Sequence, residues 1–585
     1  QILYLLLGCL IPFQFLTAKM YSSPERTPVD YVNPYIGNIS HLLVPTYPTV
    51  HLPNSMLRVY PERENFTGNT INGLPLIVTS HRGSSAFNLS PYQGELQKAG
   101  SIIQYGYDNE VIKPYYYSVD LDDDGMYVQY APSHQSGIYQ IDFSQTDKPA
   151  YLIFNTRDGE LKTDGKSISG YQKLGNHTQV YIYLETDQQP LKIGTHQGAV
   201  IRTTDKSTQG HNAYYILEYP KGTASVLLRY GVSFISSEQA KQNLRREIKN
   251  YNLQAVADKG RSVWNETLGK IFVKGGTENE KTVFYTSLYR TYERMICISE
   301  DSRYFSAYDG QVHDDEGIPF YVDDWIWDTY RATHPLRLII ETEMESNMVN
   351  SLIRMAYQMQ PNWMPTFPEI NGDSRRMNCN HGVATVLDAY NKGMRSFDLA
   401  KAYQVCKAAI TEKTLAPWSS KPAGVLDQFY KDHGYFPALA VGEQETVPEV
   451  HSWERRQPAA VTLGTVYDEW CLGNIAQALG DKKEADYFLK RSLNYHKIFN
   501  KETCFFHPKD SFGNFIQPFD YRYSSGVGGR DAYDENNGWV YRWDLPHNVA
   551  DLVNMMGGKE RFVEELERMY STPLGKGRPD FHHQF

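Results

Sequence analysis

The stretch SSEQAKQNLRREIKNYNLQA (236–255) decides the fold, because the hydrophobic period of the chain changes there. Ser237 is of a residue type that caps helices by accepting from an unpaired backbone N–H. Four residues then recur at spacings of four, three and four: Leu244, Ile248, Tyr251 and Ala255. These spacings place them on one helical face. The stretch predicts a helix that links two domains of different kinds.

On the N-terminal side of this stretch, the sequence predicts strands over residues 30–235. Segments rich in β-branched and aromatic residues recur there: AYLIFNTR (150–157), VYIYLET (180–186) and ASVLLRY (224–230). Clusters of turn-forming residues separate the segments: DDDG (122–125), TRDGE (156–160) and TDGK (163–166). Many short strands punctuated by Gly, Asp and Asn are typical of an antiparallel β-sandwich.

On the C-terminal side, helical spacings dominate from about residue 278. Apolar residues recur at i, i+3, i+4 and i+7 in two places: Val349, Leu352, Ile353 and Ala356, then Leu472, Ile475, Ala476 and Leu479 before Gly480. Such spacings indicate one buried helical face, and glycine is a common helix stop. No repeat of fixed period is present, which disfavours tetratricopeptide-like arrays. We therefore expect a β-sandwich over 30–235, a helical linker over 236–277 and a helical toroid or solenoid over 278–585.

The composition of the 585-residue chain is that of an ordinary globular protein, with 41% hydrophobic and 22% charged residues. These values exclude a disordered chain, a collagen and a polytopic membrane protein. The net charge of −10 argues against a general nucleic-acid binder. The chain is rich in aromatic residues, with 44 Tyr, 25 Phe and 9 Trp. Tyr and Trp suit sugar-binding sites, although sandwich cores use them too.

Residues 2–18 form an apolar run that is interrupted by Pro12 and Gln14, and the sequence begins at Gln1. The run fits the apolar part of an export signal in residues 1–18 whose basic start is missing. A second interpretation is a bacterial lipobox that would attach a lipid anchor at Cys9, and a third is a buried N-terminal element. The six cysteines contain no CxxC pair, so neither a zinc motif nor a disulfide framework is indicated.

Common catalytic motifs are absent from the sequence: no GxxxxGK[ST] phosphate loop, HExxH zinc motif or GxSxG nucleophile elbow occurs. Two segments instead combine tryptophan with carboxylates, DDWIWDTYRATHPL (323–336) and YDENNGWVYRWDLPHNV (533–549). Glycosidic hydrolysis uses one carboxylic acid to protonate the leaving oxygen and a second carboxylate to activate water or attack carbon. The two segments are therefore candidates for a glycosidase site.

Glu535, which lies between Tyr533 and Trp539, suits the general acid, because aromatic neighbours exclude water and keep a carboxyl group protonated. Asp328, directly after Trp327, suits an acceptor for sugar hydroxyls. The alternative is that both segments are tryptophan-anchored loops with solvated carboxylates.

Other polar residues are weaker candidates. The histidines His334, His381 and His547 are more often structural hydrogen bonders than ligands. The pair Arg375-Arg376 could clamp a hydroxyl or an anion, but such a pair is more often a solvated surface.

The chain resembles glycoside hydrolase family 92, the exo-acting α-mannosidases of bacteria. Seven segments carry the resemblance in order: VNPYIGN (32–38), DNEVIKPYYYSVDL (108–121), FYTSLYRTYERM (284–295), WDTYRATHPL (327–336), DAYNKGMRSFDLAKAY (388–403), YDEWCLGNIAQALG (467–480) and YDENNGWVYRWDLPHNV (533–549). The resemblance spans residues 30–585. It implies an N-terminal antiparallel β-sandwich followed by an (α/α)6 toroid.

The resemblance also implies hydrolysis of α-mannosides, often α-1,2-linked, with inversion and with the help of calcium. Glu535 would be the general acid, and Trp327 and Asp328 would line the mannose site. The acid-bearing segment adds three further substrate-binding residues: Asn537, Trp539 and His547. The implied partner is a mannose-containing glycan, and the implied location is the periplasm or cell surface of a bacterium, as a secreted protein or a lipoprotein.

Three features depart from the family pattern. The loop NISHLLVPTYPTVHLPNSM (38–56) lacks the usual Gly- and His-rich sequence, so the leaving-group site is expected to differ. Val540 stands where the family has Gln, which would alter a calcium site that used this Gln. The acidic segment that carries the catalytic base in the family lies beyond Phe585, so we expect the sequence to be a fragment at both ends, with an incomplete toroid.

Two other functions stay open at this point. One is a carbohydrate-binding relative without catalysis, since the segment with the base is not in the sequence. The other is a polysaccharide lyase with a toroid fold, which would use Tyr or His as the base; Tyr is abundant here, but the segment around Glu535 favours hydrolysis.

Overall fold

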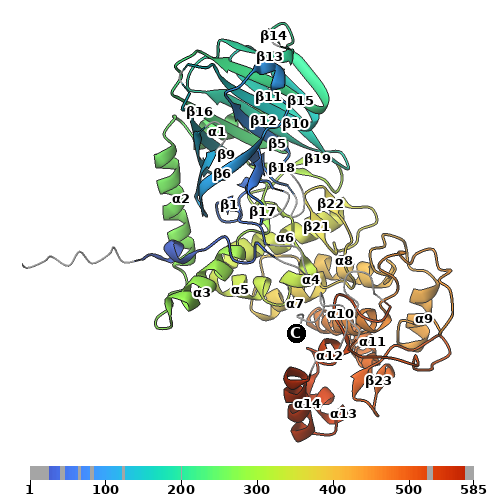
Figure 1. The fold of residues 1–585 in the computed structure, drawn as a ribbon. Helices are drawn as coiled ribbons and strands as arrows, with labels where there is room; N and C mark the ends of the chain where they lie inside the picture. Colours follow the sequence, from blue (N-terminus) through green and yellow to red (C-terminus); the bar gives the residue numbers. More distant parts are fainter. Residues whose placement is uncertain are drawn as a thin grey trace, which may run out of the picture.

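A computed structural model describes residues 26–39, 46–63, 67–79, 85–121, 125–145, 147–198, 200–522 and 531–572. Over these residues an N-terminal antiparallel β-domain is followed by a helical domain (Figure 1). This order confirms the two classes of structure predicted from the hydrophobic periods. The predicted export signal, the lipobox at Cys9 and the final segment 577–585 lie outside the described residues. The closure of the helical domain into a complete (α/α)6 toroid and the domain limits stay predictions.

The strands of the N-terminal domain have these bounds: β1 (Val50–His51), β2 (Arg58–Val59), β3 (Thr70–Asn72), β4 (Leu74–Ile77), β5 (Phe87–Tyr92), β6 (Gln104–Lys113), β7 (Tyr116–Leu121), β8 (Met126–Pro132), β9 (Ser136–Asp142), β10 (Ala150–Thr163), β11 (Ser167–Gly175), β12 (Thr178–Thr186), β13 (Lys192–Gln197), β14 (Val200–Arg202), β15 (Ser207–Tyr219) and β16 (Ser225–Ser233). All of their pairings are antiparallel. The main sheet runs β14-β13-β15-β10-β11-β12-β16-β9-β8-β7-β6-β3, and β5 joins β4 to β10.

The strands enclose an aromatic core between two layers. The hydroxyl of Tyr139 on β9 donates to the carbonyl of Pro75 on β4 at 2.6 Å, and Tyr230 on β16 donates to Leu76 at 2.7 Å. These bonds connect strands that are far apart in the sheet order, so the sheet folds over itself. Along β12, buried and half-buried residues alternate from Thr178 to Leu184, as expected of a strand with one face on the core.

One predicted turn is wrong. TRDGE (156–160) does not interrupt a strand but lies inside β10, which changes partner at this point from β5 to β11. Gly159 makes the change sterically feasible, because a Cβ there would lie 1.8 Å from the carbonyl oxygen of Tyr171 on β11. TDGK (163–166) does form the next turn, in which Asp164 accepts from the backbone N–H groups of Lys166 and Ser167.

The junction stretch forms two helices rather than one. Helix α1 (Ser237–Glu247) is capped by Ser236, whose side chain accepts from the backbone N–H of Gln239 at 3.1 Å. The cap therefore lies one residue before the predicted Ser237. Helix α2 (Leu253–Leu268) starts anew because Asn252 caps it through Ala255.

The helical domain continues with these elements: α3 (Glu278–Arg290), α4 (Ile326–Thr329), α5 (Thr333–Ile340), α6 (Thr342–Gln358), α7 (Gly382–Asn391), α8 (Leu399–Thr411), α9 (Val425–His433), α10 (Pro458–Ala478), α11 (Lys482–Arg491), α12 (Gly538–Tyr541), α13 (Val549–Met555) and α14 (Lys559–Ser571). Two-stranded pairs lie between them: β17 (Ile296–Cys297) with β20 (Tyr321–Val322), β18 (Arg303–Ser306) with β19 (Gln311–Asp314), β21 (Pro368–Glu369) with β22 (Gly372–Asp373), and β23 (Phe499–Asn500) with β24 (Phe505–Phe506). Three 3-10 helices complete the described part: Pro28–Tyr31, Leu96–Lys98 and Asn494–Lys497.

Helix α10 is the central element of the helical domain, because it packs against α7, α8 and α11 and most of its residues are buried. The predicted face Leu472, Ile475 and Ala476 is buried, whereas Leu479 is exposed. In α6 all four predicted residues, Val349, Leu352, Ile353 and Ala356, are buried.

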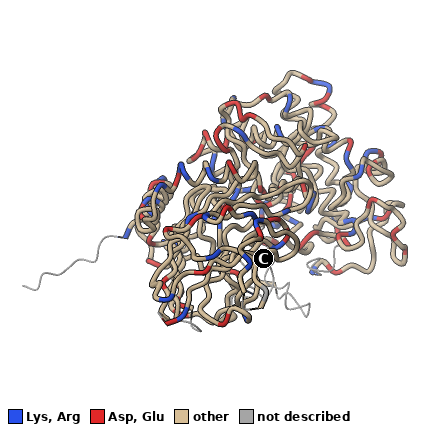
Figure 2. Tube along the Cα trace, turned by 90° about the horizontal axis from the view of Figure 1, so that it is seen from above, with Lys and Arg blue, Asp and Glu red and all other residues tan. Residues whose placement is uncertain are grey.

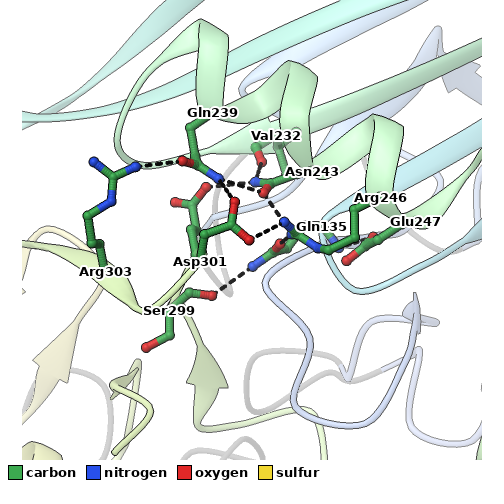
Figure 3. A network of polar contacts seen from close by, with 10 residues as sticks. Gln135, Val232, Gln239, Asn243, Arg246, Glu247, Ser299, Asp301 and Arg303 are labelled. Atoms are coloured by element: carbon green, nitrogen blue, oxygen red, sulfur yellow. Dashed lines mark hydrogen bonds and ion pairs between the residues drawn. The ribbon is translucent and has the colours of Figure 1, made fainter. Parts of the chain in front are cut away.

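A polar network joins the β-domain to the helical domain around α1 (Figure 3). Gln135, just after β8, donates to the carbonyl of Ser299 at 2.9 Å and is bonded by Arg246 of α1. Arg246 also pairs with Asp301 at 2.6 Å. Asn243 links the carbonyl of Val232 at the end of β16 to the carboxylate of Glu300. Helix α1 is therefore bonded to both domains at once.

Lys and Arg residues are interspersed with Asp and Glu over the whole trace (Figure 2). Within the described residues, no helix combines the length and the apolar sequence that a bilayer crossing requires.

Candidate active site

A pocket of about 680 Å³ opens in the helical domain, and all of its lining residues lie between Trp327 and Tyr570. The walls come from α4, the start of α7, the first half of α10, the loop before α12, and α14. The pocket lies between two hydrophobic clusters, one with Ile326 and Tyr330 and the other with Ala460 and Tyr541. The two Trp-carboxylate segments, 323–336 and 533–549, meet at this pocket.

Trp327 and Asp328 reach the pocket from the four-residue helix α4. The indole N–H of Trp327 donates to Asn378 at 3.3 Å, which fixes the ring against the start of α7. Asp324 precedes the helix and accepts from the hydroxyl of Thr329 at 2.8 Å. This bond joins the last residue of the short helix to the residues before it and so orients Asp328.

A buried group of three ionic side chains anchors the same segment on the side away from the pocket. His334 lies between Asp324 and Glu345, with 2.8 Å from Nε2 to the first carboxylate and 2.6 Å from Nδ1 to the second. All three side chains are shielded from solvent. Although burial alone would lower it, the two carboxylates raise the pKa of His334 to about 10. His334 is therefore an imidazolium that positions α4, and it does not line the pocket.

The surroundings of the pocket raise the pKa of the Asp328 carboxyl group. Its side chain is open to the mouth of the pocket. Burial by the surrounding protein nevertheless raises its pKa to about 6, and the charges of Glu535 and Asp324 add to the shift. Asp328 and Glu535 are therefore near enough to interact electrostatically across the pocket.

Glu535 projects into the pocket from a loop that its neighbours hold in place. Its backbone has a φ of 50°, which is uncommon for a residue other than glycine. Before it, the hydroxyl of Tyr533 donates to the carbonyl of Phe506 at 2.6 Å. The hydroxyl of Tyr541 returns to the carbonyl of Asp534 at 2.9 Å. These bonds compensate for a backbone conformation that costs about 1–3 kcal/mol.

Asn378 connects the two segments that form the pocket. Its side-chain oxygen accepts from Trp327, and its side-chain nitrogen donates to Gln457 at 2.7 Å and to Asp534 at 3.1 Å. Asn378 is nearly fully buried. Nothing in the sequence distinguishes this residue, because its role depends on contacts between distant segments.

The structure brings Trp327, Asp328 and Glu535 together but places the other three predicted residues outside the pocket wall. Asn537 caps α12 by accepting from the backbone N–H groups of Trp539 and Val540. Trp539 is buried with its ring edge on Phe505. His547 bonds the carbonyl of Ser492 at 3.1 Å and packs beside Tyr467 and Trp470. These three residues are not among those that line the cavity.

Sequence reasoning missed several lining residues within its own two segments. Tyr330 lines the pocket, and Arg331 pairs with Asp544 across it at 2.8 Å. Val540 also lines the pocket, and Tyr570, which lies outside the two segments, lines it from α14 and is largely exposed. The clustering of tryptophans and carboxylates located the segments, but only the fold shows which members face inward.

The pocket thus offers two neighbouring carboxylates, a tryptophan and several tyrosines, which is a set suited to binding a sugar and protonating a glycosidic oxygen. The described residues contain no group of three or more His, Cys, Asp or Glu side chains that could hold a metal ion. Val540 contributes only an apolar side chain to the wall. The five described cysteines are free and four of them are buried, as expected of core cysteines.

Comparisons with known proteins identify a family and a fold. Residues 31–233 match the glycosyl hydrolase family 92 N-terminal domain, and residues 239–584 match the glycosyl hydrolase family 92 catalytic domain. A protein of Arthroderma benhamiae described as an uncharacterized secreted glycosidase is 22% identical, over 97% of this chain and 77% of the relative.

Solved structures share the fold over most of the chain. An inverting mannosidase of family 92 from Bacteroides thetaiotaomicron is 25% identical with a TM-score of 0.81, over 93% of this chain and 74% of that one. An α-mannosidase of the same family and organism, solved with mannoimidazole, is 22% identical with a TM-score of 0.81. The match covers 94% of this chain and 75% of that one.

Proposed function

The chain belongs to glycosyl hydrolase family 92, and on this premise we propose that it releases mannose from α-mannosides, of α-1,2 type, by hydrolysis with inversion. The observation that carries the proposal is the meeting of Asp328 and Glu535 in one tryptophan-lined pocket. The similarity to the inverting mannosidase of family 92 from Bacteroides thetaiotaomicron supports the choice of sugar and stereochemistry.

In this proposal Glu535 is the general acid that protonates the leaving oxygen, and Trp327 supplies a flat apolar face for the sugar ring. Asp328 accepts hydrogen bonds from sugar hydroxyls and is ionised above its pKa of about 6. The substrate is a mannose-containing glycan outside the cell, and we propose that the protein is exported.

Calcium dependence, which the resemblance implies, is part of the same proposal, but the described residues do not by themselves fit a calcium site. Four carboxylate residues line the pocket, Asp328, Asp534, Glu535 and Asp544, but among the described residues no three His, Cys, Asp or Glu side chains are grouped so that they could hold a metal ion, and the Val540 side chain supplies no ligand atom. No step is therefore assigned to the metal. Chelation followed by calcium addition tests this part: restored mannose release would support it, and release that never changes would remove it.

The acid is tested with Glu535→Gln in the full-length gene product. An acid is needed most by a poor leaving group, so release of mannose from a disaccharide should fall by about 10²–10⁴-fold. An aryl mannoside with a good leaving group should be affected far less. Equal, small losses on both substrates would reject Glu535 as the acid. Glu343→Gln, which changes an exposed glutamate in the first turn of α6, is the matched control.

A further inference from the structure

His381 packs at the pocket wall against two aromatic rings that are also close to each other. It lies directly before α7 and lines the pocket. Its ring centroid is 4.3 Å from that of Tyr330 and 6.0 Å from that of Tyr467. The close approach of α10 completes the packing. A Cβ on Gly464 would lie 2.1 Å from the Cys379 sulfur and 3.5 Å from Cε1 of His381.

A buried carboxylate fixes which ring nitrogen carries the proton. Asp468 of α10 is fully buried, and one of its oxygens lies 2.8 Å from Nδ1 of His381. Its other oxygen accepts from the backbone N–H of Asn380 at 2.7 Å. An ionised carboxylate only accepts, so Nδ1 must be the donor. In the neutral ring, Nε2 then carries a lone pair.

Nε2 of His381 has no hydrogen-bond partner among the described residues. It is not one of the fully buried polar atoms that lack a partner. His334 provides the contrast within the same domain, because carboxylates occupy both of its ring nitrogens. His381 is satisfied at one end only, and its ring forms part of the pocket wall.

We propose that His381, oriented by Asp468, is a specificity-determining residue that accepts a hydrogen bond from one hydroxyl of the bound mannose through Nε2. The inference rests on the proposed function for the identity of the sugar. Asp468 acts through His381 and does not touch the substrate, so it is a positioning residue.

The test is His381→Asn, because the Asn amide can still donate to Asp468 but has no atom at the place of Nε2. Binding is measured by calorimetric titration of the full chain with mannose and with its 2-, 3-, 4- and 6-deoxy forms. We expect the variant to bind mannose about tenfold more weakly, the effect of one lost hydrogen bond. For one deoxy sugar the variant and the wild type should bind equally, since the same bond is missing from both. His313→Asn, a partly exposed histidine on β19, is the control.

The outcomes separate the two proposals. If the wild type binds no mannose, the proposed function fails, and the assignment of His381 to a mannose hydroxyl fails with it. If the wild type binds mannose and His381→Asn binds it equally well, only the role of His381 is overturned. Nitrogen-15 spectra of the histidine rings give a readout without ligand. A His381 signal with Nε2 protonated and Nδ1 bare would overturn the assigned orientation, and Nε2 shifting on mannose addition would support it.

Discussion

Glu535 and Asp328 reach the same pocket by different local routes. Glu535 has a left-handed backbone conformation in its loop. The hydroxyl of Tyr541 donates to this loop, and Asn537 caps the helix that follows it. Asp328 lies on one turn of helix that Thr329 ties back to Asp324. In both cases the carboxylate is set by the hydrogen bonds of its neighbours, so substitutions beside the pocket are expected to affect binding.

The titration of Asp328 predicts a pH window for sugar binding. The carboxyl pKa is about 6, raised by burial and by the charges of Glu535 and Asp324, so the group gains its proton as pH falls through 6. An acceptor of sugar hydroxyls must be ionised, and bound mannose would favour that form. Mannose affinity should therefore rise by up to about tenfold between pH 5 and pH 7. Calorimetric titration at several pH values measures it.

Asp328→Asn should bind mannose weakly and with no rise across this range. Asp432→Asn, which changes an exposed aspartate on α9, should keep the wild-type profile. If the rise persists in Asp328→Asn, the pH dependence belongs to another group.

At the scale of elements, the junction helices show what spacing predicts and what it does not. The spacing of Leu244 and Ile248 indicates a helix, and α1 is present. It cannot show where the helix starts, because Ser236 and Ser237 are equally good caps in sequence. The break before Leu253 depends on Asn252 turning its side chain to the backbone of α2, which is a matter of local geometry.

Helix α10 shows the same limit for the site. Its apolar spacing predicts a buried helix, and it is buried. Asp468 and its neighbour Glu469 stand among mostly apolar residues on that helix, and buried acids need buried partners. That signal could have indicated a site, but only the fold identifies His381 as the partner of Asp468.

The network around α1 predicts that the stability of the domain junction depends on pH. Glu300 is fully buried and accepts from the backbone N–H of Phe234 at 2.9 Å and from Asn243 at 2.7 Å. Burial raises its pKa to about 7, above the ordinary value of 4.5. The folded state therefore binds this proton more tightly than the unfolded state does. The resulting stability is complete below about pH 4.5 and is lost as pH rises through 7.

Glu300→Gln removes the titrating carboxyl group and replaces one of its two acceptor oxygens with an amide NH2. We therefore expect the variant to be less stable than the wild type at pH 5. The deficit should shrink by pH 8, at no more than about 1.4 kcal/mol per pH unit. Thermal unfolding of both proteins across this range measures the difference. Glu238→Gln, an exposed glutamate in the first turn of α1, should show a constant difference, and a constant deficit in Glu300→Gln would contradict the prediction.

At the scale of the whole molecule, the pocket joins residues about 200 positions apart in the sequence. Composition and spacing predicted both segments and the three residues that meet, Trp327, Asp328 and Glu535. Nearness in sequence was misleading for Trp539 and His547. Trp539 on α12 packs against Phe505, and His547, which follows α12, packs beside Tyr467. Which side of a short helix faces a cavity depends on packing, and packing involves the distant segments.

The two domains are predicted to unfold together because buried contacts cross between them. Arg58 of β2 and Asp323, which precedes α4, form an ion pair at 2.5 Å with both side chains only 3% exposed. Arg294 pairs with the other oxygen of Asp323 at 2.8 Å. One hydrophobic cluster also continues from the β-domain into the helical domain. Since Asp323 adjoins Asp324, the β-domain supports the segment that carries Asp328.

Arg58→Met should weaken this coupling. It leaves a buried carboxylate with one cationic partner instead of two, and breaking a buried pair costs about 3–5 kcal/mol when no partner remains. With Arg294 still in place, we expect a loss near the lower end of that range. Scanning calorimetry should show one unfolding transition in the wild type and two in the variant, with weaker mannose binding. Arg26→Met, which breaks an exposed pair with Glu278, should leave all three properties unchanged. A single transition at the wild-type temperature in Arg58→Met would show that the apolar contacts alone couple the domains.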